Sequence, residues 1–176
     1  ILTATFAFIP IPFVVTTTND VVDGVATSIT ALTSAPGPDG VISLREAILA
    51  ANGTPGPDTI PFNIPGPGPH TIRPTNALPA VTDPIIIDGT TEPDFASTPI
   101  IELDGSLAGA GANGLVLAAG ASTVRGLVIN RFGQSGIALT NAGDNVIAGN
   151  YIGTDVTGMA GGVGNVSQGI YVYTST

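Results

Sequence analysis

The apolar residues of this chain fall in short runs separated by turn residues. One class of run occurs at residues 85–89, 124–130 and 146–153, and a second class at 101–105, 114–117, 136–139 and 169–172. The two classes alternate from residue 85 onward. Apolar runs of this length, bounded by Gly, Asn and Asp, predict short β-strands rather than helices.

The runs also recur at a nearly constant distance. The steps from Gly114 to Gly136 and from Gly126 to Gly149 are both about 20 to 25 residues, the length of one coil of a solenoid. The step from Gly136 to Gly169 is longer because a Gly-rich insertion occupies residues 158–164. Stacked coils bury one continuous aliphatic column, which strands this short cannot do alone. We therefore predict an all-β fold, a right-handed parallel β-helix.

One helix is predicted, over residues 43–51. Ser43 stands three residues before Glu46, the spacing of a capping box. Gly53 offers a left-handed stop. The apolar face consists of Leu44, Ala47, Ile48 and Ala51. We expect this short helix to close the N-terminal end of the β-helix, with Ser43, Leu44, Glu46 and Ile48 as the structural cap.

These patterns divide the chain into three parts. Residues 1–12 form an uncharged, β-prone extension, residues 13–84 an N-terminal capping region, and residues 85–176 the coils. Pro-Gly runs surround the apolar stretches at 59–64 and 70–73, so these are short edge strands at most. His70 lies in this proline-rich part, and we expect no metal role for it.

Composition narrows the functional classes. Thirteen acidic residues face four arginines, for a net charge of -9, so the chain cannot build the basic face that nucleic acid requires. With no cysteine and one histidine, thiol chemistry and clustered soft metal ligands are excluded, and we expect no cofactor. Pro10 and Pro12 interrupt the only candidate for a long apolar run, so no membrane-spanning segment is predicted.

At residues 39–52 the sequence resembles a known family. Asp-Gly-Val-Ile-Ser-Leu-Arg-Glu-Ala-Ile-Leu-Ala-Ala-Asn is similar to the signature of the CSLREA-type domain, with Ile42 in place of the family's Cys. The segments at 13–20, 85–91 and 125–132 are similar to the β-helix that follows such domains in large bacterial surface and secreted proteins. The resemblance implies a fold and an extracellular or cell-surface location, but attaches no catalytic residues to the motif. Residues 1–12 lie outside it.

The carboxylates are the remaining candidates for chemistry, because parallel β-helices include enzymes that bind calcium and cleave pectin. The best group is Asp88, Glu92, Asp94 and Asp104, with Arg125 and Arg131 as possible cations. However, an Asp-Gly pair is what a strand-ending turn demands. We therefore expect turns rather than a calcium site, and we assign no catalytic residue. Arg45, in the first turn of the helix, is expected to point to water.

We favour a non-enzymatic extracellular structural or surface protein that assembles head to tail into a filament or homo-oligomer, by β-strand addition and by stacking of the final coil. The final run is β-prone and has no cap behind it, while the N-terminal extension is suited to strand addition. The expected assembly residues are Ile1, Leu2, Phe6, Phe8, Ile9, Ile11, Ile170, Tyr171, Val172 and Tyr173. The alternative is a polysaccharide-binding or polysaccharide-degrading protein. Ice binding is a third and weaker hypothesis. A simpler explanation of the uncapped end is a fragment whose parent chain continues the helix.

Overall fold

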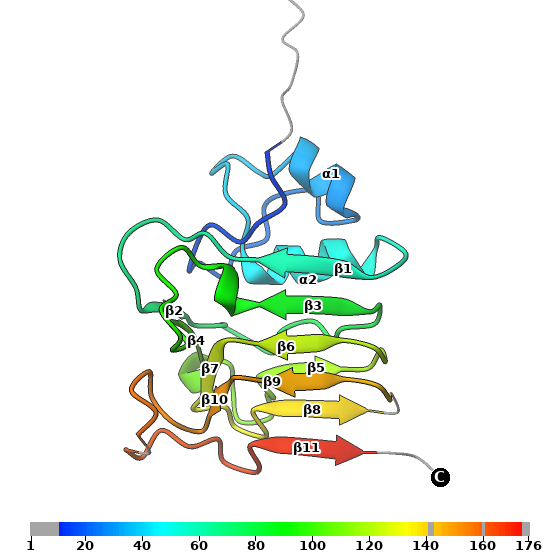
Figure 1. Ribbon diagram of the computed structural model, residues 1–176. Coiled ribbons are helices and arrows are strands. Elements are labelled where there is room, and N and C mark those ends of the chain that lie inside the picture. Colours follow the sequence, from blue (N-terminus) through cyan, green and yellow to red (C-terminus); the bar gives the residue numbers. More distant parts are fainter. Residues whose placement is uncertain (1–10, 141–142, 160, 174–176) are drawn as a thin grey trace, which may run out of the picture.

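The computed structural model describes residues 11–140, 143–159 and 161–173, and most of its regular structure is strand in three parallel sheets (Figure 1). The first sheet contains β1 (Asp58–Pro61), β3 (Ile85–Asp88), β6 (Thr123–Arg125) and β9 (Val146–Ala148). The second contains β2 (His70–Ile72), β4 (Ile101–Asp104), β7 (Leu127–Asn130) and β10 (Tyr151–Ile152). The third contains β5 (Leu115–Leu117), β8 (Ile137–Thr140) and β11 (Ile170–Tyr173). Every strand pair is parallel.

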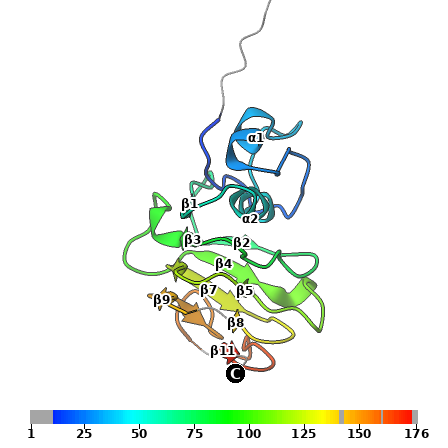
Figure 2. The same ribbon diagram turned by 90° about the vertical axis from the view of Figure 1, so that its right-hand side faces the viewer.

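The chain enters the three sheets in the same order each time, and we call one such passage a layer. The layers are β1–β2–Val81, β3–β4–β5, β6–β7–β8 and β9–β10–β11. Val81 takes the third-sheet position of the first layer through an isolated parallel bridge to Leu117. Successive layers lie one below another from the helices to β11 (Figure 2). The stacked strands thus begin at Asp58, before the predicted start of the coils at residue 85.

The grouping of the strands differs from the prediction. Each layer contains three strand positions rather than two alternating classes, and β4 pairs with β7 in the second sheet instead of with residues 114–117. The misassignment has a local cause. Only Gly126 separates β6 from β7, and only residues 149 and 150 separate β9 from β10, so each pair forms one apolar run in the sequence although its two strands belong to different sheets. Two 3₁₀ turns, η1 (Gly89–Thr91) and η2 (Gly105–Leu107), follow β3 and β4.

The core is an aliphatic column between the sheets. Alternate residues of each strand point into it, as expected for a period of two. The inward residues of the second layer are Ile85, Ile87, Ile101, Leu103, Leu115 and Leu117, each at most 1% exposed. Full burial of one such side chain stabilises the fold by roughly 1.5 to 3 kcal/mol. Parallel register stacks each inward position on the next, so the column continues through the layers.

Two helices lie above the first layer, α1 (Ile29–Ser34) and α2 (Leu44–Asn52) (Figure 1). α2 falls within one residue of its predicted bounds, and its predicted apolar face is buried. α1 was not predicted, because its sequence Ile-Thr-Ala-Leu-Thr-Ser is rich in residues of low helix propensity. The Ser28 hydroxyl caps it by accepting a hydrogen bond from the Ala31 amide at 3.1 Å.

The C-terminal stop of α2 is not the left-handed one that was predicted. Gly53 has a φ of -94°, which any residue can adopt. Glycine is needed there because a Cβ would overlap the carbonyl oxygen of Thr27. The glycine therefore serves close packing between the end of α2 and the loop that leads to α1.

Candidate functional site

The motif at residues 43–48 ties the helical end of the molecule together. Ser43 and Glu46 form the predicted capping box, with Ser43 Oγ accepting from the Glu46 amide at 3.2 Å and Glu46 Oε2 accepting from the Ser43 amide at 3.0 Å. Glu46 Oε1 also accepts hydrogen bonds from the amides of Asp23 and Gly24 at 3.0 and 2.8 Å. Glu46 is 1% exposed, so its carboxylate joins α2 to the loop that contains Asp23 and Gly24, more than 20 residues earlier in the sequence, in the interior of the protein.

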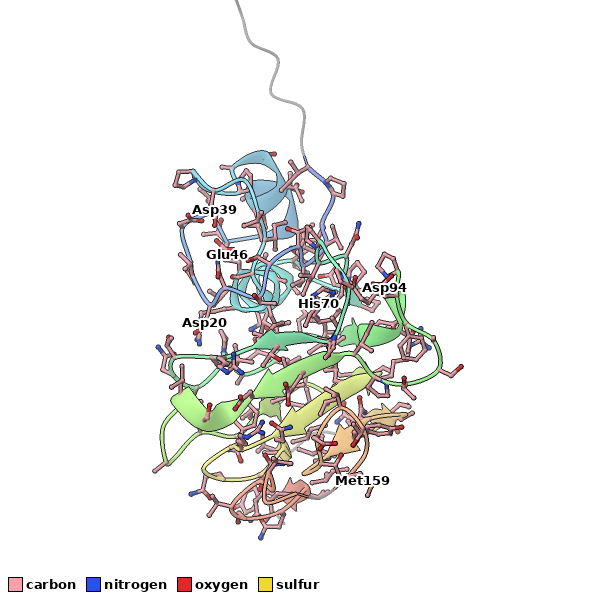
Figure 3. All side chains as sticks on the ribbon, turned by 90° about the vertical axis from the view of Figure 1, so that its left-hand side faces the viewer. Asp20, Asp39, Glu46, His70, Asp94 and Met159 are labelled. Carbon is pink, nitrogen blue, oxygen red and sulfur yellow. The ribbon has the colours of Figure 1, made fainter. Side chains whose placement is uncertain are left out.

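Arg45 does not point to water, which corrects the prediction. Its Nε and Nη2 atoms contact the two carboxylate oxygens of Asp20 at 2.8 and 2.9 Å, and its Nη1 atom donates to the Ala77 carbonyl at 2.9 Å. Asp20 also accepts from the amide and hydroxyl of Thr75 at 2.7 and 2.9 Å. A bidentate pair of this kind is both strong and directional. Arg45 thus joins α2 to the loops that carry Asp20 and Ala77. Figure 3 shows Asp20 beside the helix.

The four acidic residues considered for calcium do not form one site. Asp88 and Asp104 end β3 and β4, where each caps the following 3₁₀ turn through the amide of Thr90 or Ser106. Glu92 is buried and accepts from the Ile64 amide, whereas Asp94 is exposed on a loop at the edge of the molecule (Figure 3). Across the described ranges, no group of three His, Cys, Asp or Glu side chains could hold a metal ion.

Arginines neutralise the two strand-ending aspartates. Arg125 Nη2 lies 2.6 Å from Asp88 Oδ2, and Arg73 Nε lies 3.1 Å from Asp104 Oδ2. Burial alone would raise the pKa of Asp88, but the hydrogen bonds from Arg125 and Thr90 outweigh it and lower that pKa. Burial alone would also raise the pKa of Asp104. The hydrogen bonds from Ser106 and the charge of Arg131 outweigh this effect, so the pKa of Asp104 is lowered as well. Both groups are stable carboxylates rather than proton donors at neutral pH.

A polar network crosses the outer face of the second sheet. Glu102 Oε2 accepts from the Thr71 hydroxyl, and Glu102 Oε1 accepts from Asn130 Nδ2, each at 2.8 Å. Arg131 Nη1 lies 3.4 Å from Glu102 Oε1 and 3.6 Å from Asp104 Oδ2. Glu102 and Asn130 are buried, so the network links three consecutive layers in a water-poor setting. Such a network fixes the register of the sheet.

A shallow pocket of about 350 Å³ borders this network. Its lining residues are Thr18, Asn19, Asp20, Val21, Thr71, Arg73 and Thr75. The charged groups in the lining are already engaged, Asp20 with Arg45 and Arg73 with Asp104. All four arginines of the chain lie in the described part, and each forms an ion pair. The pocket therefore offers no basic side chain to an acidic sugar without breaking an internal pair.

His70 begins β2, in the stretch 70–73 for which a short edge strand was predicted, and its side chain is buried. Its Nε2 atom lies 3.8 Å from Glu92 Oε1 and has no hydrogen-bond partner among the described residues. Figure 3 shows the side chain within the body of the molecule. The His70–Glu92 pair is a buried contact between the first and second layers, and the two groups do not amount to a metal centre.

The final layer leaves its inward face uncovered. The register pairs Ile170 with Ile137 and Val172 with Leu139, so Ile170 and Val172 point toward the core column. Their exposed fractions are 43% and 61%, against 0% for Ile137 one layer earlier. Tyr171 and Tyr173 take the alternate, outward positions and are also exposed. β11 is the outermost strand of the third sheet.

The structure describes only one of the predicted assembly residues near the N-terminus, Ile11. Ile1, Leu2, Phe6, Phe8 and Ile9 lie outside the described residues. Ile11 packs against the core, and its amide donates to the Thr33 carbonyl at 3.0 Å. Residues 11 and 12 are therefore part of the folded body, and only residues before them are candidates for strand exchange.

Sequence reasoning missed the partners of the ion pairs. Asp20, Arg73 and Glu102 were not singled out, although each joins segments more than 20 residues apart. The run Ile-Glu-Leu-Asp at 101–104 carried a usable signal, because alternation places Glu102 and Asp104 on one face of the strand. The partners on neighbouring strands depend on register, which one sequence does not define.

Comparison with known proteins does not assign this chain to a family. No family model matches the sequence, and no curated protein matches it. Within the described residues, neither helix has the length and apolar character needed to cross a membrane.

Proposed function

We propose that this chain is a non-enzymatic structural protein of the cell exterior, a right-handed parallel β-helix that assembles head to tail. The carrying observation is the uncovered inward face of the last layer, where Ile170 and Val172 are 43% and 61% exposed. The corresponding residues of the earlier layers are buried, apart from Leu139, which is partly buried. A partner that continues the column would remove this apolar surface from water.

The β-helix part of the proposal rests on the order of the strands. Parallel pairing, three sheets entered in a fixed order and one shared aliphatic column are the features of a solenoid with three strands per coil. Crossovers between parallel strands are right-handed in nearly all proteins, which favours the right-handed form. The helix α2, which contacts β1, then acts as the N-terminal cap.

The partner we propose is the N-terminal segment of a second copy. The helices α1 and α2 lie at the opposite end of the molecule from β11 (Figure 1). Because helices cover that end, two molecules cannot continue the column by placing a first layer directly on a last layer. Residues 1–10 are uncharged and rich in β-prone residues, and they lead into the helical end at Ile11. A strand from them can pair with the edge of β11 in a neighbour.

The ion pairs and turn caps formed by the charged side chains support a non-enzymatic role. The strand-ending aspartates cap turns and pair with arginines, and each of the four arginines is engaged. An enzyme acting on acidic polysaccharides needs carboxylates that are free to bind a metal or transfer protons, together with a free cation. The competing explanation for the open end is a continuing polypeptide that supplies the next coil.

The test is sedimentation velocity over a range of protein concentrations, with electron microscopy of the same samples. We expect the wild type to associate and form filaments, and both Val172→Asp and a deletion of residues 1–10 to remain monomeric. Val166→Asp is the matched control, because Val166 is 79% exposed and lies in the loop before β11. It should assemble like the wild type. A wild type that stays monomeric would refute self-assembly and favour the continuing polypeptide.

A further inference from the structure

A second hollow lies on the outer side of the last layers, and none of the functions discussed so far uses it. Its volume is about 520 Å³. The lining residues are Gly111, Asn113, Gln134, Ser135, Ser167, Gln168 and Tyr171. This lining, which we call the amide groove, consists of amides, hydroxyls, one glycine and one aromatic ring. In a chain of net charge -9, a hollow lined without any acidic or basic side chain is a distinctive feature.

The groove is built from equivalent positions of three layers. Asn113, Ser135 and Gln168 each stand two residues before the first residue of β5, β8 and β11, and the strand register aligns them. Adjacent parallel strands are about 4.8 Å apart, so a polar side chain recurs along the groove at that spacing. A linear ligand with a short repeat would meet an equivalent group at each layer.

The hydrogen bonds inside the groove hold it in shape and leave donors available. Gln168 Oε1 accepts from the hydroxyls of Ser135 and Ser167 at 2.9 and 2.7 Å, and Asn113 Oδ1 accepts from the Ser135 amide at 3.0 Å. The Nδ2 group of Asn113 and the Nε2 group of Gln168 make no hydrogen bond within the described part of the chain. Their orientation is set by the oxygen of the same amide, so the N–H donors are preorganised.

Tyr171 supplies the apolar surface. Its position in β11 corresponds to Ala138 in β8, on the outward face of the third sheet, and the side chain is 43% exposed. A tyrosine offers a flat apolar ring with a polar tip, which suits a ligand that has both apolar C–H faces and hydroxyl groups. Amide donors and acceptors beside such a ring match the hydroxyls of a sugar.

We propose that the amide groove binds a neutral linear polysaccharide. The uncharged lining argues against an acidic sugar, because such a ligand would enter a strongly acidic protein with no cation to receive its carboxylate. The groove faces outward, whereas the assembly face of β11 points into the column. The two sites therefore use opposite faces of one strand, and this inference does not depend on the proposed assembly.

Affinity electrophoresis in native gels tests the inference. The probes are the neutral polymers hydroxyethylcellulose, xyloglucan and galactomannan, with polygalacturonate as the acidic comparison. We expect at least one neutral polymer to retard the wild type, and polygalacturonate not to do so. Tyr171→Ala should raise the dissociation constant for the polymer by about threefold to tenfold, the effect of losing one aromatic contact. Gln168→Ala should weaken it as well.

Tyr173→Ala is the matched control, because Tyr173 lies on the same strand and is 49% exposed, close to the 43% of Tyr171, but does not line the groove. It should bind like the wild type, as should the assembly variant Val172→Asp. Thermal melting confirms that each variant is folded. The inference is overturned if none of the neutral polymers retards the protein, if polygalacturonate binds better than they do, or if Tyr173→Ala or Val172→Asp loses as much affinity as Tyr171→Ala.

Discussion

Glu46 is expected to be the polar side chain on which the helical end depends most. Its carboxylate accepts hydrogen bonds from the amides of Asp23 and Gly24 at Oε1 and from the Ser43 amide at Oε2, and the Ser43 hydroxyl lies 3.0 Å from Oε2. The substitution Glu46→Gln keeps the size of the side chain. It replaces one oxygen by an NH₂ group, which then faces two donors instead of accepting from them.

The magnitude follows from these contacts. A hydrogen bond to a charged group contributes about 1.5 to 3 kcal/mol, so the loss of two costs roughly 3 kcal/mol or more. The amides of Asp23 and Gly24 are only partly buried, and water can replace some of what they lose, which places the expected value near 3 kcal/mol. Loss of the capping box alone would cost about 1 kcal/mol. A total stability of about 5 to 15 kcal/mol is typical of a domain, so the loss is large.

The assay is urea unfolding followed by circular dichroism. At a slope of about 2 kcal/mol per M, a loss of 3 kcal/mol lowers the midpoint by about 1.5 M. Asp94→Asn is the control, since Asp94 is exposed and hydrogen-bonds to no described residue; its midpoint should change by less than about 0.3 M. Equal midpoints for Glu46→Gln and Asp94→Asn would refute the argument that this carboxylate joins the loop to α2.

Three further outcomes are expected from the charged groups. Asp20→Ala should destabilise the protein by about 3 to 5 kcal/mol in urea, because it leaves Arg45 largely buried and unpaired; an unchanged midpoint would contradict this. The pKa of Asp88 is lowered below its ordinary value of 3.8, so its stabilising effect is present above that pH and lost as the pH falls through the lowered value. Asp88→Asn should therefore destabilise at pH 7 and flatten the acid limb of a stability–pH curve. Burial and the nearby charge of Asp83 raise the pKa of Asp58, so its ionised form destabilises the folded protein. Asp58→Asn should therefore stabilise the protein at pH 7, where Asp88→Asn destabilises it, and should have little effect at pH 3. Equal effects of Asp58→Asn at both pH values would contradict this.

Local patterns predicted the local structure of this chain well. The capping box of Ser43 and Glu46 and the bounds of α2 follow from spacing within a few residues. The prediction of strands also succeeded, because short β-branched runs between turn residues have few alternatives. The step from Gly114 to Gly136 matches the observed pairing of β5 with β8.

What the sequence could not provide was the identity of the partners. Arg45 meets Asp20 across 25 residues, and Glu102 meets Asn130 across 28, and neither separation corresponds to a helical or strand period. Which face of β11 carries Tyr171 was equally open, because two exposed tyrosines alternate with two aliphatic residues. In each case the answer depends on the register between layers, a property of the whole stack.

The register of β11 gives the last layer two different surfaces. A strand at the end of the column must present every second side chain inward, and with no described layer beyond it Ile170 and Val172 remain partly exposed. The intervening positions face outward, where Tyr171 borders the amide groove. A change at one position therefore leaves the other surface intact. Because adjacent residues of one strand belong to opposite faces, we expect the proposed assembly and the proposed sugar binding to be lost separately, and a protein that used β11 for one purpose alone would not show that separation.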